Sequence, residues 1–268
     1  MIKRGENKIK TLIVTGGSSG IGKEFIRQYL NINKNLWVIN LSRSKPENLE
    51  VFYKFTHLEA DFSSPESAKI ASFALLDLLK SEHSKGEVML VNNSGIGSVG
   101  GFVDLPVERE LEIVDINIKA PMILVSTLYP FLRKHGGSIV NISSTASYQP
   151  TPGFSTYGAS KAFLTSWSLA LWKELAKDRI SVVTVCPGPT STAFFDNAGM
   201  KGRKDKVRHM TVEKTVEKTI EAVIKGSPLV ICGFTNRIIA SIAGILPNTW
   251  ITRIAEIAIR SQKLNESN

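Results

Sequence analysis

The chain has 268 residues, of which 43% are hydrophobic and 21% are charged, and it carries a formal net charge of +9. This composition excludes disordered and collagen-like chains, and a chain of this length can bury a full core without disulfides or metals. The positive charge is concentrated at one end, because residues 201–268 hold 12 Lys or Arg and 6 Asp or Glu.

Several local features bear on location and partners. The first ten residues are polar and basic and lack the apolar core of a signal peptide. Cys186 and Cys232 lie in apolar runs typical of strands, so we expect a reduced protein of the cytoplasm. No nucleic-acid-binding signature accompanies the basic excess, so we expect no nucleic-acid partner. The four histidines lack metal-ligand spacing, which predicts no metal site: His57, His83, His135 and His209.

Apolar or β-branched runs alternate with longer helical patterns along the chain. We predict strands at Thr11–Thr15, Leu36–Leu41, Phe55–Asp61, Glu87–Asn93, Gly137–Ser144, Arg179–Gly188 and Pro228–Gly233. Helical patterns end at Tyr29, cover Ser64–Glu82 and Leu111–Arg133, and begin again at Ser155. This alternation predicts one α/β domain over residues 1–268, with a doubly wound parallel sheet covered by helices on both faces. Ligands of such sheets bind beyond the carboxyl ends of the strands.

A glycine-rich turn, Thr15–Gly22, follows the first predicted strand and opens a helix. Glycines let the backbone approach a pyrophosphate, and the amides of the helix N-terminus point at it. Gly17–Lys23 also fits a nucleotide-hydrolysing phosphate loop, but Glu24 stands where that loop needs Ser or Thr for magnesium. We therefore predict dinucleotide binding by Gly16, Ser18, Ser19, Gly20, Ile21 and Gly22.

Polar residues also follow the second and third strands. Ser42, Arg43 and Ser44 come after the second strand, where an acidic residue would favour a free ribose hydroxyl. Arginine suits a 2′-phosphate instead, although a solvated surface loop is the alternative. After the third strand, Asp61 and Phe62 are expected to contact an adenine. Asp61 is also a candidate cap for the helix that follows.

The heptapeptide STYGASK places Tyr157 and Lys161 four residues apart, on one face of the expected helix. Taken alone, it is also typical of an amphipathic helix start with a half-buried Tyr and a surface Lys. The fourth, fifth and sixth strands, however, also end in small, polar or glycine residues. Ser144 ends the fifth strand thirteen positions before Tyr157, which favours a functional reading.

Together these motifs resemble those of the short-chain dehydrogenase/reductase family. TGGSSGIG resembles its TGxxxGxG, Asn92–Gly95 its NNAG with Ser94 in place of alanine, and STYGASK contains its YxxxK. Asn117 with Ala120 resembles its NxxA/G element, and Pro187-Gly188 its PG turn. The resemblance extends to about Gly233. It implies a Rossmann-type three-layer fold with seven parallel strands, and hydride transfer between a nicotinamide cofactor and a carbonyl or alcohol.

The resemblance also implies roles for individual residues. Tyr157 would be the general acid of reduction, and the Lys161 cation would lower the pKa of the phenol and hold the nicotinamide ribose. Ser144 would donate a hydrogen bond to the substrate oxygen, and Asn117 would position a water that relays protons. Ser143 does not match the thirteen-residue spacing and receives no catalytic role. Further cofactor contacts are expected at Asn93, Ser94, Gly95, Pro187, Gly188, Thr190 and Thr192.

We thus predict an NADP(H)-dependent carbonyl reductase or alcohol dehydrogenase. The alternative is a catalytically silent dinucleotide-binding sensor or scaffold, which loss of Tyr157 or Lys161 would indicate. Aromatic residues in the expected substrate loops predict an apolar substrate: Phe102, Tyr148, Phe154, Phe194 and Phe195. Family members are commonly homodimers or homotetramers, and we expect the same here.

Residues 234–268 form a C-terminal extension with apolar residues at helical spacing. Ile238–Thr252 is uncharged but too short to span a bilayer, so no transmembrane helix is expected. We predict two short amphipathic helices broken at Pro247. Three occupants of their apolar faces stay open: the parent domain or a second subunit, the substrate under a lid, or a membrane surface touched peripherally.

Overall fold

The centre of the fold is a sheet of seven parallel strands, seen in a computed structural model that describes residues 8–47, 54–82, 86–190, 194, 198–199 and 210–264, the last seven by their backbone alone. The strands are β1 (Ile9–Thr15), β2 (Trp37–Ser42), β3 (Lys54–Glu59), β4 (Glu87–Asn92), β5 (Gly137–Ile142), β6 (Ile180–Cys186) and β7 (Leu229–Ile231). Their order in the sheet is β3-β2-β1-β4-β5-β6-β7. The order reverses between β1 and β4, which is where ligands bind in sheets of this kind.

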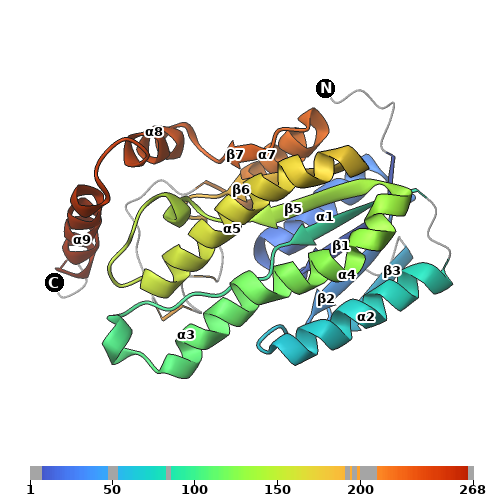
Figure 1. The fold of residues 1–268 in the computed structure, drawn as a ribbon, viewed down its shortest axis with the longest axis horizontal. Coiled ribbons are helices and arrows are strands. Elements are labelled where there is room, and N and C mark those ends of the chain that lie inside the picture. The colour runs from blue at the N-terminus through green and yellow to red at the C-terminus, as the bar shows by residue number, and fades with distance from the viewer. Residues whose placement is uncertain are drawn as a thin grey trace.

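Helices cover both faces of the sheet (Figure 1). One face packs against α2 (Pro65–Ser81), α4 (Ala120–His135) and α5 (Ser155–Leu175), and the other against α1 (Gly20–Ile32) and α7 (Val212–Lys225). Side chains alternate along each strand, so that in β1 Ile13 enters the first core and Leu12 and Val14 enter the second. The three-layer doubly wound fold expected from the sequence is therefore confirmed.

Shorter elements lie at the carboxyl edge of the sheet. They are η1 (Phe102–Asp104), α3 (Val107–Val114) and η3 (Thr145–Tyr148), while η4 (Ala176–Asp178) follows α5. A π-helical turn, η2 (Asp115–Lys119), joins α3 to α4, so the three form one continuous helical segment. Turns of this kind occur often at functional sites, and this one contains Asn117.

The predicted strands all form, with small differences at their ends. β6 stops at Cys186 and β7 at Ile231, whereas the sequence pattern extends both strands to the next glycine. Pro187 lacks the N–H that would continue the ladder, and Gly233 has a φ of 98°, outside the strand region. Cys186 and Cys232 are buried free cysteines, as expected.

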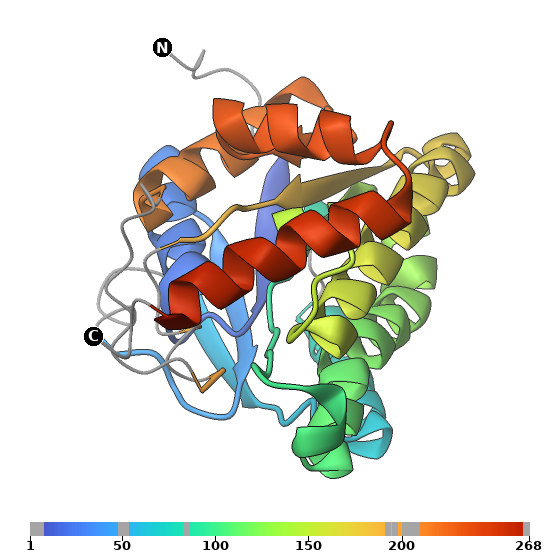
Figure 2. The same ribbon diagram turned by 90° about the vertical axis from the view of Figure 1, so that its left-hand side faces the viewer.

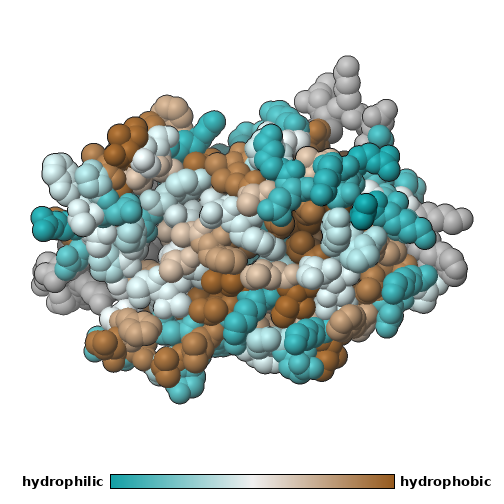
Figure 3. Space-filling model, in the orientation of Figure 1, coloured by the Kyte–Doolittle hydropathy of each residue, from teal (hydrophilic) through white to brown (hydrophobic). Residues whose placement is uncertain are grey.

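Two helices follow the last strand, α8 (Phe234–Ala243) and α9 (Asn248–Leu264), and the predicted break at Pro247 is confirmed. Figure 2 shows α9 in the foreground, crossing the carboxyl edge of the sheet. Figure 3 shows apolar side chains gathered over α8. In the part of the chain that the structure describes, no helix is both long and apolar enough to cross a membrane.

Candidate active site

A cavity of about 510 Å³ lies at the carboxyl ends of the strands, where the sequence predicts it. Six of the loops that follow strands contribute to its lining. The predicted site residues that line it are Gly16, Ser18, Ser19, Gly20, Ile21, Ser42, Arg43, Ser44, Asp61, Phe62, Asn93, Ser94, Gly95, Ser144, Tyr157, Lys161, Pro187, Gly188 and Thr190. Gly22 and Asn117 do not line it, and Thr192 falls outside the described residues.

The glycine-rich turn is held in place from both neighbouring strands. The backbone N–H of Gly17 donates to the side-chain oxygen of Asn40 on β2 over 2.9 Å. From the end of β4, the Asn93 amide donates to the carbonyls of Thr15 and Gly16 over 2.9 and 3.1 Å. Gly16 has a φ of 67°, a conformation that favours glycine. The turn is thus fixed with the first amides of α1 directed at the cavity.

Gly22 has a packing role in place of the predicted cofactor contact. A Cβ atom at this position would lie 2.5 Å from both the Asn93 side-chain nitrogen and the Gly16 carbonyl oxygen. The glycine therefore lets α1 lie close to the turn and to β4. The signal for this role is its place as the last glycine of the motif, which in such turns serves close packing.

Asn40 is a residue that the sequence pattern did not single out. It is fully buried on β2. Its amide nitrogen donates to the Ser42 hydroxyl over 2.8 Å, and that hydroxyl donates to the Ser44 carbonyl over 2.7 Å. The Ser42 hydroxyl therefore shapes the loop, while the exposed Arg43 side chain is carried at the edge of the cavity.

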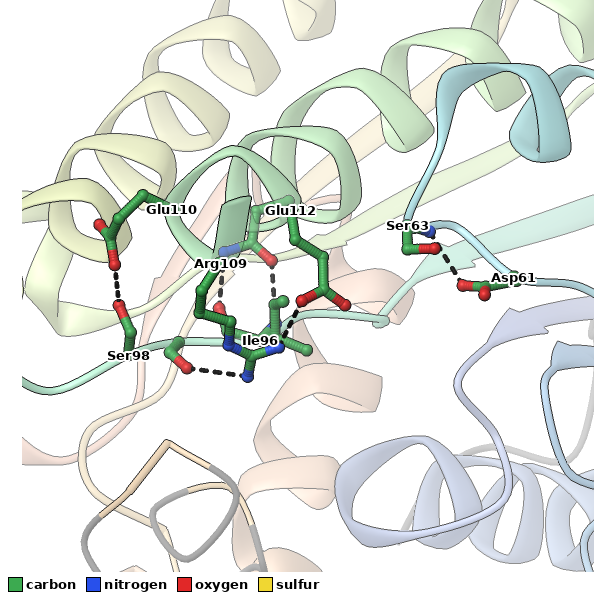
Figure 4. A network of polar contacts seen from close by, with 9 residues as sticks. Asp61, Ser63, Ile96, Ser98, Arg109, Glu110 and Glu112 are labelled. Atoms are coloured by element: carbon green, nitrogen blue, oxygen red, sulfur yellow. Dashed lines mark hydrogen bonds and ion pairs between the residues drawn. The ribbon is translucent and has the colours of Figure 1, made fainter. Parts of the chain in front are cut away.

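The loop after β3 lines the cavity with Asp61 and Phe62, as predicted, but Asp61 does not cap the next helix. Its carboxylate accepts from the backbone N–H of Ser63 over 3.0 Å (Figure 4). The N-cap of α2 is Ser64, whose hydroxyl accepts from the N–H of Ser67 over 3.1 Å. The ring of Phe62 is buried in the core below the loop.

Tyr157 and Lys161 lie one turn apart at the start of α5, and both are buried. The Lys161 ammonium donates to the carbonyl of Ile142 at the end of β5 over 2.9 Å, and it lies 5.9 Å from the centre of the Tyr157 ring. The predicted pairing on one helix face is therefore present. The ammonium of this pair is held at the carboxyl end of β5.

The predicted lowering of the Tyr157 pKa is wrong for this geometry. Burial raises the pKa of Tyr157 to about 12, and the hydrogen bond with Ser144 opposes this only in part. Burial also lowers the pKa of Lys161 to about 8. The ammonium is directed at the Ile142 carbonyl and is itself destabilised by burial, so it does not compensate for the burial of the phenol. The phenol is consequently protonated at neutral pH.

The two neighbouring serines have different surroundings. The Ser143 hydroxyl is buried, donates to the Lys161 carbonyl over 2.9 Å and lies 2.7 Å from the Thr165 hydroxyl. The Ser144 hydroxyl caps η3 by accepting from the N–H of Ala146 over 3.1 Å. Of the two serines, only Ser144 interacts with Tyr157, and its catalytic role stays a prediction.

Asn117 lies beside the cavity wall and fixes its shape. Its side-chain oxygen accepts from the N–H of Ile96, and its amide nitrogen donates to the Ile96 carbonyl, both over 3.0 Å. The same nitrogen donates to the Ser160 hydroxyl over 2.9 Å. Both amide hydrogens are thus used within the protein. The side chain ties the loop after β4 to α5, and a role in holding water stays a prediction.

The same loop is held from α3 by two residues that the sequence pattern missed (Figure 4). Arg109 donates to the carbonyl of Gly97 over 3.2 Å and pairs with Glu112 over 2.6 Å. Glu110 is buried and accepts from the Ser98 hydroxyl. Nothing in the local pattern distinguishes Arg109 and Glu110 from an ordinary charged helix, since only the fold brings α3 against this loop.

Aromatic side chains surround the Tyr157 phenol. The rings of Phe154 and Phe194 lie 6.0 and 5.2 Å from the Tyr157 ring, between centroids. Two of the other predicted pocket aromatics are placed elsewhere. Phe102 is exposed on η1, and Tyr148 is directed at the buried Cys186 thiol, 3.9 Å away. Phe195, the last of the set, lies outside the described residues.

No group of three or more His, Cys, Asp or Glu side chains among the described residues is placed to hold a metal ion. The chemistry available at the cavity is that of a protonated phenol, a hydroxyl and an ammonium beside a glycine-rich anion site. Such a set can bind a dinucleotide and deliver a proton to an oxygen atom.

A model of the short chain dehydrogenase family matches residues 10–201. The hydroxysteroid dehydrogenase-like protein 1 of Gallus gallus is 33% identical over 65% of this chain and 54% of its own length. The 3-oxoacyl-[acyl-carrier-protein] reductase FabG of Chlamydia muridarum is 29% identical over 75% of this chain and 79% of its own. This chain thus spans about half of the first of these relatives.

A solved structure with a similar fold is that of a short-chain dehydrogenase from Sphingobium yanoikuyae in complex with NADPH. The two sequences are 25% identical, and the superposition covers 88% of this chain and 93% of the Sphingobium chain, with a TM-score of 0.75. The fold is therefore that of a known group of proteins.

Proposed function

The chain belongs to the short-chain dehydrogenase/reductase family of oxidoreductases, and we propose that it reduces the carbonyl group of an apolar substrate with NADPH. One observation carries the proposal. A phenol that burial keeps protonated, Tyr157, lies in one cavity with Ser144, Lys161 and the glycine-rich turn. This is the set of groups needed to bind a dinucleotide, orient a carbonyl and protonate its oxygen.

The cofactor would supply the hydride, and the chain's own groups would handle the oxygen and its proton. The Ser144 hydroxyl donates a hydrogen bond to the substrate oxygen and stabilises the charge that develops there. The Tyr157 phenol then gives its proton to that oxygen. A phenol with a pKa of about 12 is fully protonated at neutral pH and is almost never the phenolate that alcohol oxidation needs as a base. The raised pKa therefore leaves the phenol in the form of a proton donor, which is the role that reduction gives to Tyr157.

Lys161 has two roles in this proposal. With a pKa of about 8, its ammonium is mostly charged at pH 7. Its bond to Ile142 fixes it at the floor of the cavity, where it can donate to ribose hydroxyls. It also provides positive charge one helical turn from the phenol.

A preference for NADPH over NADH is supported by the loop after β2. Asn40 and Ser42 hold this loop by internal hydrogen bonds, and Arg43 is exposed at the cavity edge. Arginine can bind a 2′-phosphate through two hydrogen bonds, and the stretch Ser42–Lys45 around it has no acidic residue to repel the phosphate.

An apolar substrate is supported by the rings of Phe154 and Phe194 beside the phenol. A polar substrate would have to leave its hydroxyl groups without partners against these rings. We further propose a homodimer or homotetramer in the cytoplasm. The oligomer is supported by Met122 on α4 and Phe163 on α5, which are exposed on the face of the sheet that these helices cover. The cytoplasm is supported by the two buried cysteines, which are free thiols.

A catalytically silent sensor or scaffold is not favoured by any observation. Tyr157 and Lys161 are both present and both line the cavity. A protein that kept only the binding role would not need a protonated phenol in the cavity.

The test is NADPH oxidation over a broad panel of ketones and aldehydes, followed by absorbance. Wild-type protein is expected to turn over at least one apolar carbonyl, with NADPH oxidised faster than NADH. Tyr157→Phe should bind NADPH, measured by fluorescence titration, without turning over. Equal turnover by the two proteins would remove Tyr157 as the acid, and the absence of any turnover together with the absence of NADPH binding would refute the proposed activity.

A further inference from the structure

Helix α8 has its large and small apolar residues in unusual places. One stripe comprises three residues of α8, Phe234, Ile238 and Ile242, and Ile245 two residues past its end, at spacings of three or four. Each is exposed, from 45% for Ile238 to 83% for Ile245. The residues that α8 buries are alanines, Ala240 and Ala243. A helix that only completed the core would do the reverse, because burying an isoleucine removes far more apolar surface from water.

Helix α9 repeats this arrangement. It buries Ile251 and Ala255, while Trp250, Ile254 and Ile257 form an exposed stripe at the same spacing. The exposed fractions are 60%, 59% and 68%. α9 is therefore attached to the protein along one face and carries a second apolar face turned away from it.

Basic residues flank both stripes. Arg237 and Arg253 are exposed, and each stands three positions after the first residue of its stripe, Phe234 and Trp250. From Gly233 to Leu264 the sequence has one acidic residue, Glu256, which is half-buried. The stripes thus combine exposed apolar side chains with positive charge, the pattern of helices that lie on anionic lipid surfaces.

These helices lie at the same edge of the sheet as the cavity. α8 contacts η3, whose residues Thr145 and Ala146 line the cavity. At the start of α8, Asn236 donates to the Cys232 carbonyl over 2.6 Å and fills the space where a side chain at Gly188 would stand. Figure 2 shows α9 crossing the same edge of the sheet. A surface bound by the stripes would therefore lie at the same edge of the sheet as the site.

A second exposed apolar group at this edge has a different charge character. It comprises Phe102, Val103, Val107 and Leu111 on η1 and α3. The acidic side chains of Asp104 and Glu108 are exposed among them. An anionic surface would repel this group, so the observations favour the α8–α9 stripes alone.

We propose that the α8–α9 stripes dock the protein peripherally on an anionic lipid bilayer. The aromatic and isoleucine side chains enter the interface, and Arg237 and Arg253 face the lipid headgroups. An apolar carbonyl dissolved in the bilayer would then be held beside the cavity. Docking itself requires no turnover, so its test stands apart from that of the proposed reaction.

The experiment is co-sedimentation of the full chain with vesicles of phosphatidylcholine alone and of phosphatidylcholine with 30% phosphatidylserine. Binding to the anionic vesicles is expected to be stronger and to weaken with salt. Ile254→Asp should lower the partition coefficient at least about tenfold, because an isoleucine is lost from the interface and a negative charge is added. Arg237→Gln and Arg253→Gln should each lower it about fivefold.

A matched control is Ile224→Asp on α7. Ile224 is 53% exposed, close to the 59% of Ile254, and lies near the helix end that leads into the amino end of β7. The Ile224→Asp variant should bind vesicles as strongly as the wild type does. Equal losses from Ile224→Asp and Ile254→Asp, equal binding to both vesicle types, or no binding by the wild type would overturn the proposal. A wild-type oligomer that Ile254→Asp converts to monomers in light scattering would also overturn it, since a second copy would then cover the stripe.

Discussion

The start of α5 and the α8–α9 pair depart in opposite ways from the rule that charged side chains are exposed and large apolar side chains are buried. At the start of α5 Lys161 is only 4% exposed, whereas on α8 Ile242 is 49% exposed. The buried Lys161 has a partner in the Ile142 carbonyl, and the surrounding fold holds it there. The isoleucines of α8 leave apolar surface exposed to water, which is unfavourable for the folded protein. The alanines on the opposite side of the helix bury only a small apolar area in return. Departures of this kind mark functional sites more often than accidents of packing.

The difference between the two regions is also one of partners. The polar groups at the start of α5 are fixed by hydrogen bonds within the chain. Ser143, Ser144 and Asn117 bond to residues of α5, and Lys161 donates to the Ile142 carbonyl. A site of this kind acts by preorganised geometry. The α8–α9 stripes are exposed, so their function must come from what they contact outside the chain.

The largest effect is expected at the phenol. Tyr157→Phe removes the proton donor but leaves the ring against Phe154 and Phe194, so turnover should fall by about 10²–10⁴-fold with little change in NADPH affinity. Steady-state rates and a fluorescence titration measure the two quantities. Gly97→Ala is a useful companion, because its Cβ would lie 3.0 Å from the Phe194 ring and 3.3 Å from the Tyr157 ring. It should raise KM more than it lowers kcat; the opposite split would show that Gly97 affects the chemical step.

A pair of alanine variants separates the two faces of α9. Ile251 is 5% exposed, so Ile251→Ala should lower the free energy of unfolding by about 2–5 kcal/mol. Ile254 is exposed, and Ile254→Ala should change it by no more than about 0.5 kcal/mol. Urea denaturation of both variants provides the comparison. Equal losses would mean that Ile254 is covered in the folded protein, against the docking proposal.

The pH dependence of stability reports on the buried lysine. Lys161 loses its proton near pH 8 in the folded chain and near 10.5 when unfolded. Between these values the unfolded chain binds more protons, so raising the pH favours the folded state through this group. The stability of wild type relative to Lys161→Met should therefore rise from pH 8 to 10.5, by about 3 kcal/mol. A stability difference between the two proteins that stays constant across this range would show that folding does not lower the pKa of Lys161.

A modest effect on cofactor preference is expected at the exposed cavity edge. Arg43→Ala should narrow the preference for NADPH over NADH by about 1–3 kcal/mol, since one charge-assisted interaction with the 2′-phosphate is lost. Titrations with both cofactors measure the ratio, and Lys45→Ala two residues away is the control for loss of general positive charge. A ratio unchanged by Arg43→Ala but reduced by Lys45→Ala would move phosphate recognition to the lysine.

Much of the fold and most of the site could be predicted from sequence. The alternation of short apolar runs with helical patterns determined a parallel sheet, because only strands buried on both faces tolerate such runs. The residues after each strand then had to meet at one edge, which brought Tyr157, Lys161, Ser144 and the glycine-rich turn into one cavity. Local spacing also predicted the break between α8 and α9, since proline cannot continue a helix.

Other features depended on contacts between distant segments. Asn40 and Arg109 support the site through partners 23 and 12 residues away, and their neighbours in sequence do not reveal them. Gly22 and Asn117 belong to recognisable motifs, yet only the packed structure shows that they serve close packing and loop attachment.

The pKa of Tyr157 shows most clearly what the tertiary structure decides. Sequence spacing places a lysine one turn away and so predicts a lowered pKa, but spacing carries no information on burial. The fold encloses both groups, and the cost of removing a charge from water then exceeds their mutual attraction. In the same way, the sequence of α8 and α9 determines two apolar stripes, whereas only the packing of Ala240, Ala243, Ile251 and Ala255 decides which faces remain exposed.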